Sequence, residues 1–116
     1  MDQQKEKKVK ITVIVPCYNE EAALHYFYEE MQKVMGIMQD VEFELLFVND
    51  GSGDRTLKVI KELAEKDACV SYISFSRNFG KEAAIFAGLE HSDGDLTAIM
   101  DADLQDPPSL LPEMYR

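Results

Sequence analysis

The sequence predicts an α/β domain in which a parallel sheet is covered by helices on both faces. First, short β-rich runs alternate with helical patterns along the 116 residues, as in folds built from strand–helix–strand crossovers. Second, the first run, ITVIV, is apolar without interruption, which is typical of a strand buried on both faces. Third, the composition (46% hydrophobic, 29% charged) is that of a soluble globular domain.

Four apolar runs are short enough, and rich enough in β-branched and aromatic residues, to be strands. Val and Ile dominate the first run. The predicted strands span residues 9–15, 42–48, 70–76 and 96–100.

Helical patterns separate these runs, because apolar residues recur there at three- and four-residue steps. In the first pattern Leu24, Phe27 and Met31 belong to one apolar stripe, which we assign to the core. Asp54 is placed to cap the second helix, and prolines open the fourth, where the first turn tolerates them. The predicted helices span residues 20–38, 53–67, 81–91 and 107–116.

Charge and cysteine content limit the partners and the compartment. We expect a charged leader at residues 1–8, solvated or touching an anionic membrane, and one domain at residues 9–116. A net charge of −10 argues against nucleic acid as the partner and suits a site that holds a cation. Two unrelated thiols, Cys17 and Cys69, favour a reduced, cytosolic location. No run reaches the ~20 apolar residues of a membrane span, so we expect the given chain to be soluble.

Polar residues follow the carboxyl end of every predicted strand. The segments are PCYNEE, NDGSGD, RNFGKE and DADLQD, in that order. Ligands of open α/β sheets bind in the crevice at the carboxyl ends of the strands. The sequence therefore predicts that these four segments meet at one binding site.

The last segment offers oxygen ligands for a metal ion. Asp101, Asp103 and Gln105 alternate along the chain, so an extended segment can turn all three toward one point. Such ligands select Mg²⁺ or Mn²⁺, and Mg²⁺ is often completed by substrate phosphates, so a nucleoside diphosphate suits the pair. An isolated Asp-x-Asp is more often a surface turn or a helix cap. Its position at a strand end favours the metal site.

The segment NDGSGD is either a plain strand-to-helix turn or part of the site. In the second interpretation Asp50 accepts a hydrogen bond from a nucleobase or ribose, and helix-start amides face an anion. Neither GxGxxG nor GxxxxGK[ST] is present, which disfavours dinucleotide-fingerprint and P-loop chemistry.

Taken together, VPCYNEE, FVNDGSGDRT, SRNFGKEAAIFAG and MDADLQDPP resemble the inverting family 2 glycosyltransferases. SRNFGKEAA and DADLQDPP are typical of the polyprenyl-phosphate branch, which includes dolichol-phosphate mannosyltransferase and bacterial undecaprenyl-phosphate relatives. The resemblance runs from Ile11 to Arg116. It implies a Rossmann-like parallel sheet with flanking helices, which is the nucleotide-sugar-binding half of a GT-A fold.

The resemblance also assigns roles on the nucleotide side of the site. Pro16, Tyr18 and Glu20 would line the nucleotide pocket. Asp50 would contact the base, and Asp101 would lie near the ribose and the metal.

On the phosphate side, Asp103 and Gln105 would hold Mg²⁺ or Mn²⁺ together with the diphosphate. Arg77, Asn78 and Lys81 would lie near the sugar phosphate, or else form a capped turn into the third helix. The acceptor, a polyprenyl phosphate, is already an anion and needs no general base, so no catalytic residue is assigned.

In the family an acceptor half, and usually transmembrane helices, follow the metal motif. We therefore expect the given chain to be a truncated donor-binding half, inactive alone, whose full-length protein works at the cytoplasmic face of a membrane. Two alternatives remain at this stage. One is an acidic, flavodoxin-like receiver that accepts a phosphoryl group on Asp50, and the other is a non-catalytic binding module.

Overall fold

The structure is a computed structural model that describes residues 8–103 and residue 112. Within that part the chain alternates strand and helix, as predicted. The charged leader apart from Lys8, the candidate ligand Gln105 and nearly all of the predicted fourth helix lie outside the described residues. The strands are β1 (Val9–Cys17), β2 (Val41–Asn49), β3 (Val70–Ser74) and β4 (Leu96–Ile99), and the helices are α1 (Glu21–Ile37), α2 (Thr56–Lys66) and α3 (Lys81–His91).

The strands form one parallel sheet in the order β3-β2-β1-β4, which confirms the predicted fold class. From β1 the chain crosses to β2 and β3 on one side and then returns to place β4 on the other side of β1. The order therefore reverses between β1 and β4. In open α/β sheets this reversal opens a crevice at the carboxyl ends, where ligands bind.

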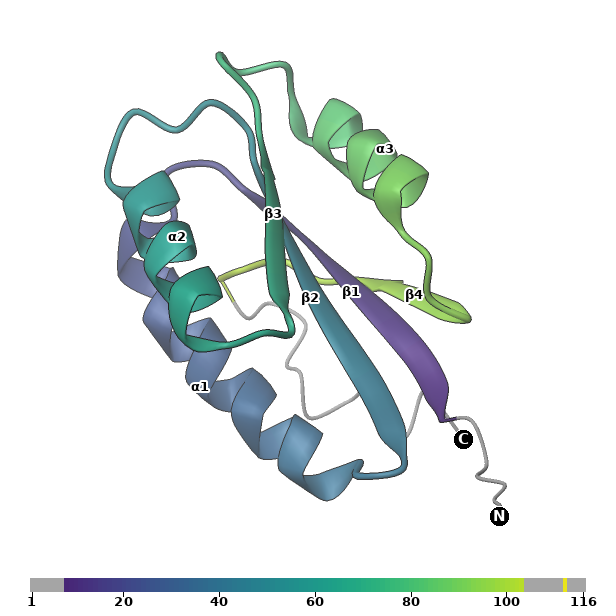
Figure 1. Ribbon diagram of the computed structural model, residues 1–116. Coiled ribbons are helices and arrows are strands. Elements are labelled where there is room, and N and C mark those ends of the chain that lie inside the picture. The colour runs from purple at the N-terminus through teal and green to yellow at the C-terminus, as the bar shows by residue number, and fades with distance from the viewer. Residues whose placement is uncertain (1–7, 104–111, 113–116) are drawn as a thin grey trace.

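Helices cover both faces of the sheet (Figure 1), with α1 and α2 on one face and α3 on the other. The larger core joins α1 and α2 to the sheet through fully buried side chains such as Val13, Phe27 and Phe47. The smaller core packs Ala84 of α3 against Ile14 and neighbouring β2 residues. Helix α3 comes close because Gly88 has no side chain, since a Cβ there would lie 2.6 Å from a methyl carbon of Ile14.

Several element boundaries differ from the sequence prediction. Helix α2 begins at Thr56 instead of residue 53, because residues 50–55 form a loop that is hydrogen-bonded to the β1–α1 loop. Strand β3 ends at Ser74, two residues early. Helix α1 begins one residue late and ends one residue early. Among the described residues no helix combines the length and the apolarity that a membrane crossing requires.

Candidate functional site

A pocket of about 230 Å³ opens at the carboxyl end of the sheet, where the strand order reverses between β1 and β4. It collects residues from all four of the segments that the sequence singled out. They are Pro16, Cys17, Tyr18, Glu20, Asp50, Lys81, Asp101 and Asp103.

Strand β4 delivers the Asp-x-Asp segment to this pocket. Ile99 pairs with Ile14, and the next amide, that of Met100, donates to the Ile14 carbonyl at 3.0 Å. Met100 and Ala102 are then buried at 3% and 0% exposure, whereas the two acids on either side of Ala102 turn toward the pocket. The small, apolar Ala102 thus faces the core while the carboxylates face solvent. This is the alternation that the sequence predicted for an extended segment.

The β1–α1 loop is held by the β2–α2 loop. Asn19, at φ 55°, lies in the left-handed region, and its side-chain oxygen accepts a hydrogen bond from the Gly53 amide at 2.8 Å. Its own amide donates to Ser52 Oγ at 3.0 Å, and the Glu20 amide donates to Thr56 Oγ1 at 2.8 Å. These contacts fix the backbone on both sides of Asn19, from which two pocket residues project.

Asp54 ties the same two loops together. Its carboxylate accepts the Thr56 amide at 2.9 Å and the Glu21 amide at 3.3 Å. The predicted cap is wrong by one residue, because the N-cap position of α2 is Arg55, which makes no side-chain cap hydrogen bond, and Asp54 precedes it. Burial raises the pKa of Asp54, but the hydrogen bonds from Thr56 and Glu21 outweigh burial and leave the pKa below its ordinary value. Ionised Asp54 therefore stabilises the folded loops.

Asp50 anchors the loop that leads into α3. Only 3% of Asp50 is exposed, and its carboxylate accepts hydrogen bonds from the Phe79 amide (2.8 Å), the Gly80 amide (3.0 Å) and Asn78 Nδ2 (3.0 Å). Next to it, Gly51 has φ +69°, and a Cβ there would lie 2.1 Å from the Arg77 carbonyl carbon. Sequence patterns could not reveal this role, because the anchored amides are about 30 positions from Asp50. A buried, fully hydrogen-bonded Asp50 is also a poor phosphoryl acceptor, which counts against the receiver alternative.

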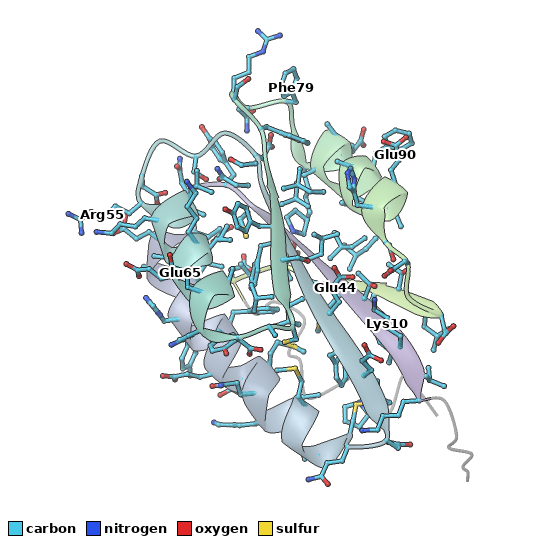
Figure 2. All side chains as sticks on the ribbon, in the orientation of Figure 1. Lys10, Glu44, Arg55, Glu65, Phe79 and Glu90 are labelled. Carbon is cyan, nitrogen blue, oxygen red and sulfur yellow. The ribbon has the colours of Figure 1, made fainter. Side chains whose placement is uncertain are left out.

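The three residues predicted for the sugar-phosphate side are used differently. Lys81 lines the pocket, whereas the side-chain amide of Asn78 donates hydrogen bonds to Asp50. Arg77 stacks over the ring of Phe79 at 4.7 Å and is not among the lining residues. Figure 2 shows Phe79 at the carboxyl end of the sheet, with Lys10 and Glu44 toward the opposite end.

The pocket is negatively charged and already contains one cationic group. Burial raises the pKa of Glu20, and the nearby carboxylates of Asp103 and Asp101 raise it further, while Lys81 partly offsets them. Lys81 Nζ lies 2.7 Å from Asp101 Oδ1. Burial also raises the pKa of the Cys17 thiol, which keeps that group neutral. The pocket therefore favours a ligand that brings positive charge.

The donor set fits a hard divalent cation that shares its coordination with a substrate. Asp101 and Asp103 supply two carboxylates to the same pocket. Within residues 8–103 and 112, no three His, Cys, Asp or Glu side chains are grouped closely enough to hold a metal by themselves. Mg²⁺ is commonly held by one or two carboxylates plus substrate phosphates. The third predicted ligand, Gln105, falls outside the described part of the chain.

A larger hollow of about 540 Å³ lies between the amino-terminal ends of α1 and α2. Its lining mixes acidic and basic residues, among them Glu21, Asp54 and Arg55, that bond to one another across the two loops. It receives no residue from β4 or α3. The smaller pocket at the strand ends therefore remains the candidate site.

Comparison with known proteins identifies the family of the chain. The family model "Glycosyl transferase family 2" matches residues 12–116. The chain is 44% identical over 108 residues to an uncharacterized glycosyltransferase, YkcC, of Bacillus subtilis, covering 93% of this chain and 33% of that protein. It is 44% identical over 106 residues to the bactoprenol glucosyl transferase of Shigella phage SfV, covering 91% and 34%. The chain thus spans about a third of the length of the curated relatives it matches.

Solved structures share the fold. The mannosyltransferase PcManGT from Pyrobaculum calidifontis, in complex with GDP-Man and Mn²⁺, matches with a TM-score of 0.75 at 25% identity, covering 90% of this chain and 31% of that one. S. aureus TarS 1–349 in complex with UDP-GlcNAc matches with a TM-score of 0.73 at 23% identity, covering 92% and 30%. These neighbours are GT-A glycosyltransferases, so the sheet and its helices are part of a GT-A fold. Because the family model matches nearly the whole length of this chain, the chain belongs to glycosyl transferase family 2.

Proposed function

We propose that this chain forms the donor site of a metal-dependent inverting glycosyltransferase that moves a sugar from a UDP- or GDP-sugar to a polyprenyl phosphate. The observation that carries the proposal is the meeting of Asp101 and Asp103 with Tyr18 and Glu20 in one pocket at the sheet's switch point. A nucleoside diphosphate needs both a lined pocket and a counter-cation, and this arrangement offers a lined pocket and two carboxylates that would hold the cation.

On the nucleotide side, Pro16, Tyr18 and Glu20 would surround the base and ribose, and Asp101 would lie between the ribose and the metal. Asp50, predicted to contact the base, would instead act at this pocket by holding the loop before α3. Tyr18 is 49% exposed, which leaves its ring available to a flat base. Structural neighbours crystallised with GDP-Man and with UDP-GlcNAc support a nucleotide-sugar donor.

On the phosphate side, Asp101, Asp103 and Gln105 would hold Mg²⁺ or Mn²⁺. The ion, when bound, would stabilise the charge that develops on the departing nucleoside diphosphate. The Mn²⁺ in the structure of the Pyrobaculum mannosyltransferase supports a divalent ion. Lys81 would face the diphosphate, while Asn78 and Arg77 would support the loop before α3.

The acceptor in the proposal is a polyprenyl phosphate. Several relatives at 44% identity carry the name bactoprenol glucosyl transferase, which supports a lipid-linked acceptor. A phosphate oxygen is already ionised, so its attack on the anomeric carbon needs no general base from this chain. In this proposal the whole protein transfers the sugar at the cytoplasmic face of a membrane.

Titration calorimetry with UDP and with GDP, with and without Mn²⁺, tests the donor site. We expect one nucleotide to bind in Mn²⁺, and Asp103→Asn to weaken binding at least about tenfold, since a charged ligand to the ion is lost. Asp93→Asn is the matched control, because Asp93 is exposed and pairs with Lys10 away from the pocket lining. If neither nucleotide binds at millimolar concentration in either condition, the proposal is wrong.

A further inference from the structure

The placement of Lys81 is unfavourable for the helix that carries it. Lys81 is the first residue of α3, and the N-cap residue before it, Gly80, offers no side-chain hydrogen bond. The amino-terminal end of a helix has a partial positive charge, so a cation in the first turn is mildly destabilising. Helix stability therefore does not explain this side chain.

The contact with Asp101 explains why a lysine stands at position 81. The two groups are 2.7 Å apart, and the Asp101 side chain is only 26% exposed. Asp101 is one of the two carboxylates that the proposed metal would need, and it shares the pocket with Asp103 and Glu20. The ammonium group therefore occupies the place of a cation in a pocket lined by four carboxylates.

The loop geometry allows the ammonium to move while its backbone stays in place. The amides of Phe79 and Gly80 are held by the buried Asp50 carboxylate, which fixes the start of α3. The Lys81 side chain itself is 59% exposed and has a flexible four-carbon stem. It can therefore leave Asp101 and still reach a ligand in the same pocket.

We propose that Lys81 is a positioning residue that exchanges partners. Without a divalent ion its ammonium neutralises Asp101; when the ion binds, the ammonium is displaced and contacts the diphosphate of the donor. This proposal rests on the proposed function. A divalent ion that binds without nucleotide must displace Lys81 from Asp101. When the nucleotide is also present, the displaced ammonium contacts its diphosphate and stabilises the complex. The metal ion and the nucleotide are therefore expected to bind with positive coupling.

Mn²⁺ binding, followed by electron paramagnetic resonance of the free ion, tests the exchange on the 116-residue chain. We expect Lys81→Met to bind Mn²⁺ alone roughly two- to five-fold more tightly, since a competing half-exposed ion pair is removed. With Mn²⁺ saturating, the same variant is expected to bind the preferred nucleotide, UDP or GDP, about tenfold more weakly. Lys81→Arg keeps the charge and is expected to retain weak Mn²⁺ binding.

The matched control is Lys33→Met. Lys33 is also exposed and forms an ion pair with Glu30 at 2.8 Å, but it lies on α1 and not in the pocket lining. Thermal melts of each variant verify that the fold is kept.

The outcomes separate this inference from the proposed function. If the unaltered chain binds Mn²⁺ and a nucleotide but Lys81→Met leaves Mn²⁺ affinity unchanged or lowers it, the exchange is wrong and the donor site stands. If the unaltered chain binds no nucleotide in Mn²⁺, the proposed function fails. If it binds no Mn²⁺, the exchange fails as well.

Discussion

At the scale of single residues, the pocket contains a carboxylate that opposes folding. Glu20 is half-buried and faces Asp103 and Asp101, and both burial and these neighbours raise its pKa. An acid whose pKa is higher in the folded state costs stability whenever it is ionised, and the cost disappears as pH falls below the unfolded value. Such a cost is typical of residues kept for binding.

Glu20→Gln is therefore expected to stabilise the chain at pH 7. The gain is roughly 0.5 kcal/mol after solvent screening, and it should vanish at about pH 3, below the unfolded pKa, where both states bind the proton. Urea unfolding at the two pH values measures it, with the exposed Glu29→Gln on α1 as control. A loss of stability at pH 7 would show that Glu20 is favourably paired. The same variant should also bind the nucleotide–Mn²⁺ pair more weakly.

Gly51 is a second residue whose identity the geometry dictates. Alanine there would need φ near +69° and would place its Cβ 2.1 Å from the Arg77 carbonyl carbon. We expect Gly51→Ala to lower the free energy of unfolding by about 3 kcal/mol or more, from backbone strain and the clash together. Gly36→Ala is the control, because a Cβ there meets nothing within 4 Å in α1, and it should gain about 0.5–1 kcal/mol. Equal effects of the two changes in denaturant unfolding would contradict the packing of these loops.

At the scale of elements, the β1–α1 and β2–α2 loops behave as one unit. Asn19 and Glu20 bond across to Ser52, Gly53 and Thr56, so neither loop is ordered independently of the other. The pocket residues on the first loop thus depend on hydrogen bonds made by the second.

Acid should loosen this unit through Asp54. Its pKa is lowered in the folded state, so its stabilisation is present above the unfolded value and is lost as pH falls through the folded one. We expect the free energy of unfolding to fall below about pH 4, and Asp54→Asn to show a shallower fall. At pH 7 Asp54→Asn should lose less than about 1 kcal/mol, because Asn still accepts a hydrogen bond.

Denaturant unfolding from pH 7 to pH 3 measures this dependence. Asp40→Asn is the control, since Asp40 is exposed in the turn between α1 and β2. If Asp54→Asn follows the unaltered chain in acid, the carboxylate does not hold the loops.

Elements were predictable where one pattern decides them. The continuous apolar run of β1 and the three- and four-residue spacing in α1 predict those elements, because burial on two faces or on one stripe is recorded in the residues themselves. The start of α2 could not be predicted in this way. Residues 53–55 have a helical pattern, but partners more than 30 positions away hold them in a loop. Contacts between distant segments override local preference there.

At the scale of the whole molecule, the order β3-β2-β1-β4 brings the site together. The sequence could predict which loops meet, because carboxyl ends of parallel strands lie at one edge. It could not predict which side chains bind to other parts of the protein and which remain available to a ligand. The Asp50 carboxylate accepts hydrogen bonds from the loop before α3, and Lys81 pairs with Asp101. Both contacts join segments 20 or more positions apart.

The most direct test of this account is paramagnetic broadening of backbone amide signals by Mn²⁺ in the presence of the preferred nucleotide. We predict broadening centred on Tyr18, Glu20, Lys81 and Asp101, which the structure places around one pocket. Amides near Lys10 and Glu44, toward the opposite end of the sheet in Figure 2, should stay sharp. Broadening centred on the hollow between α1 and α2, or at the amino end of the sheet, would contradict the account, because the cation would then bind away from Asp101 and Asp103.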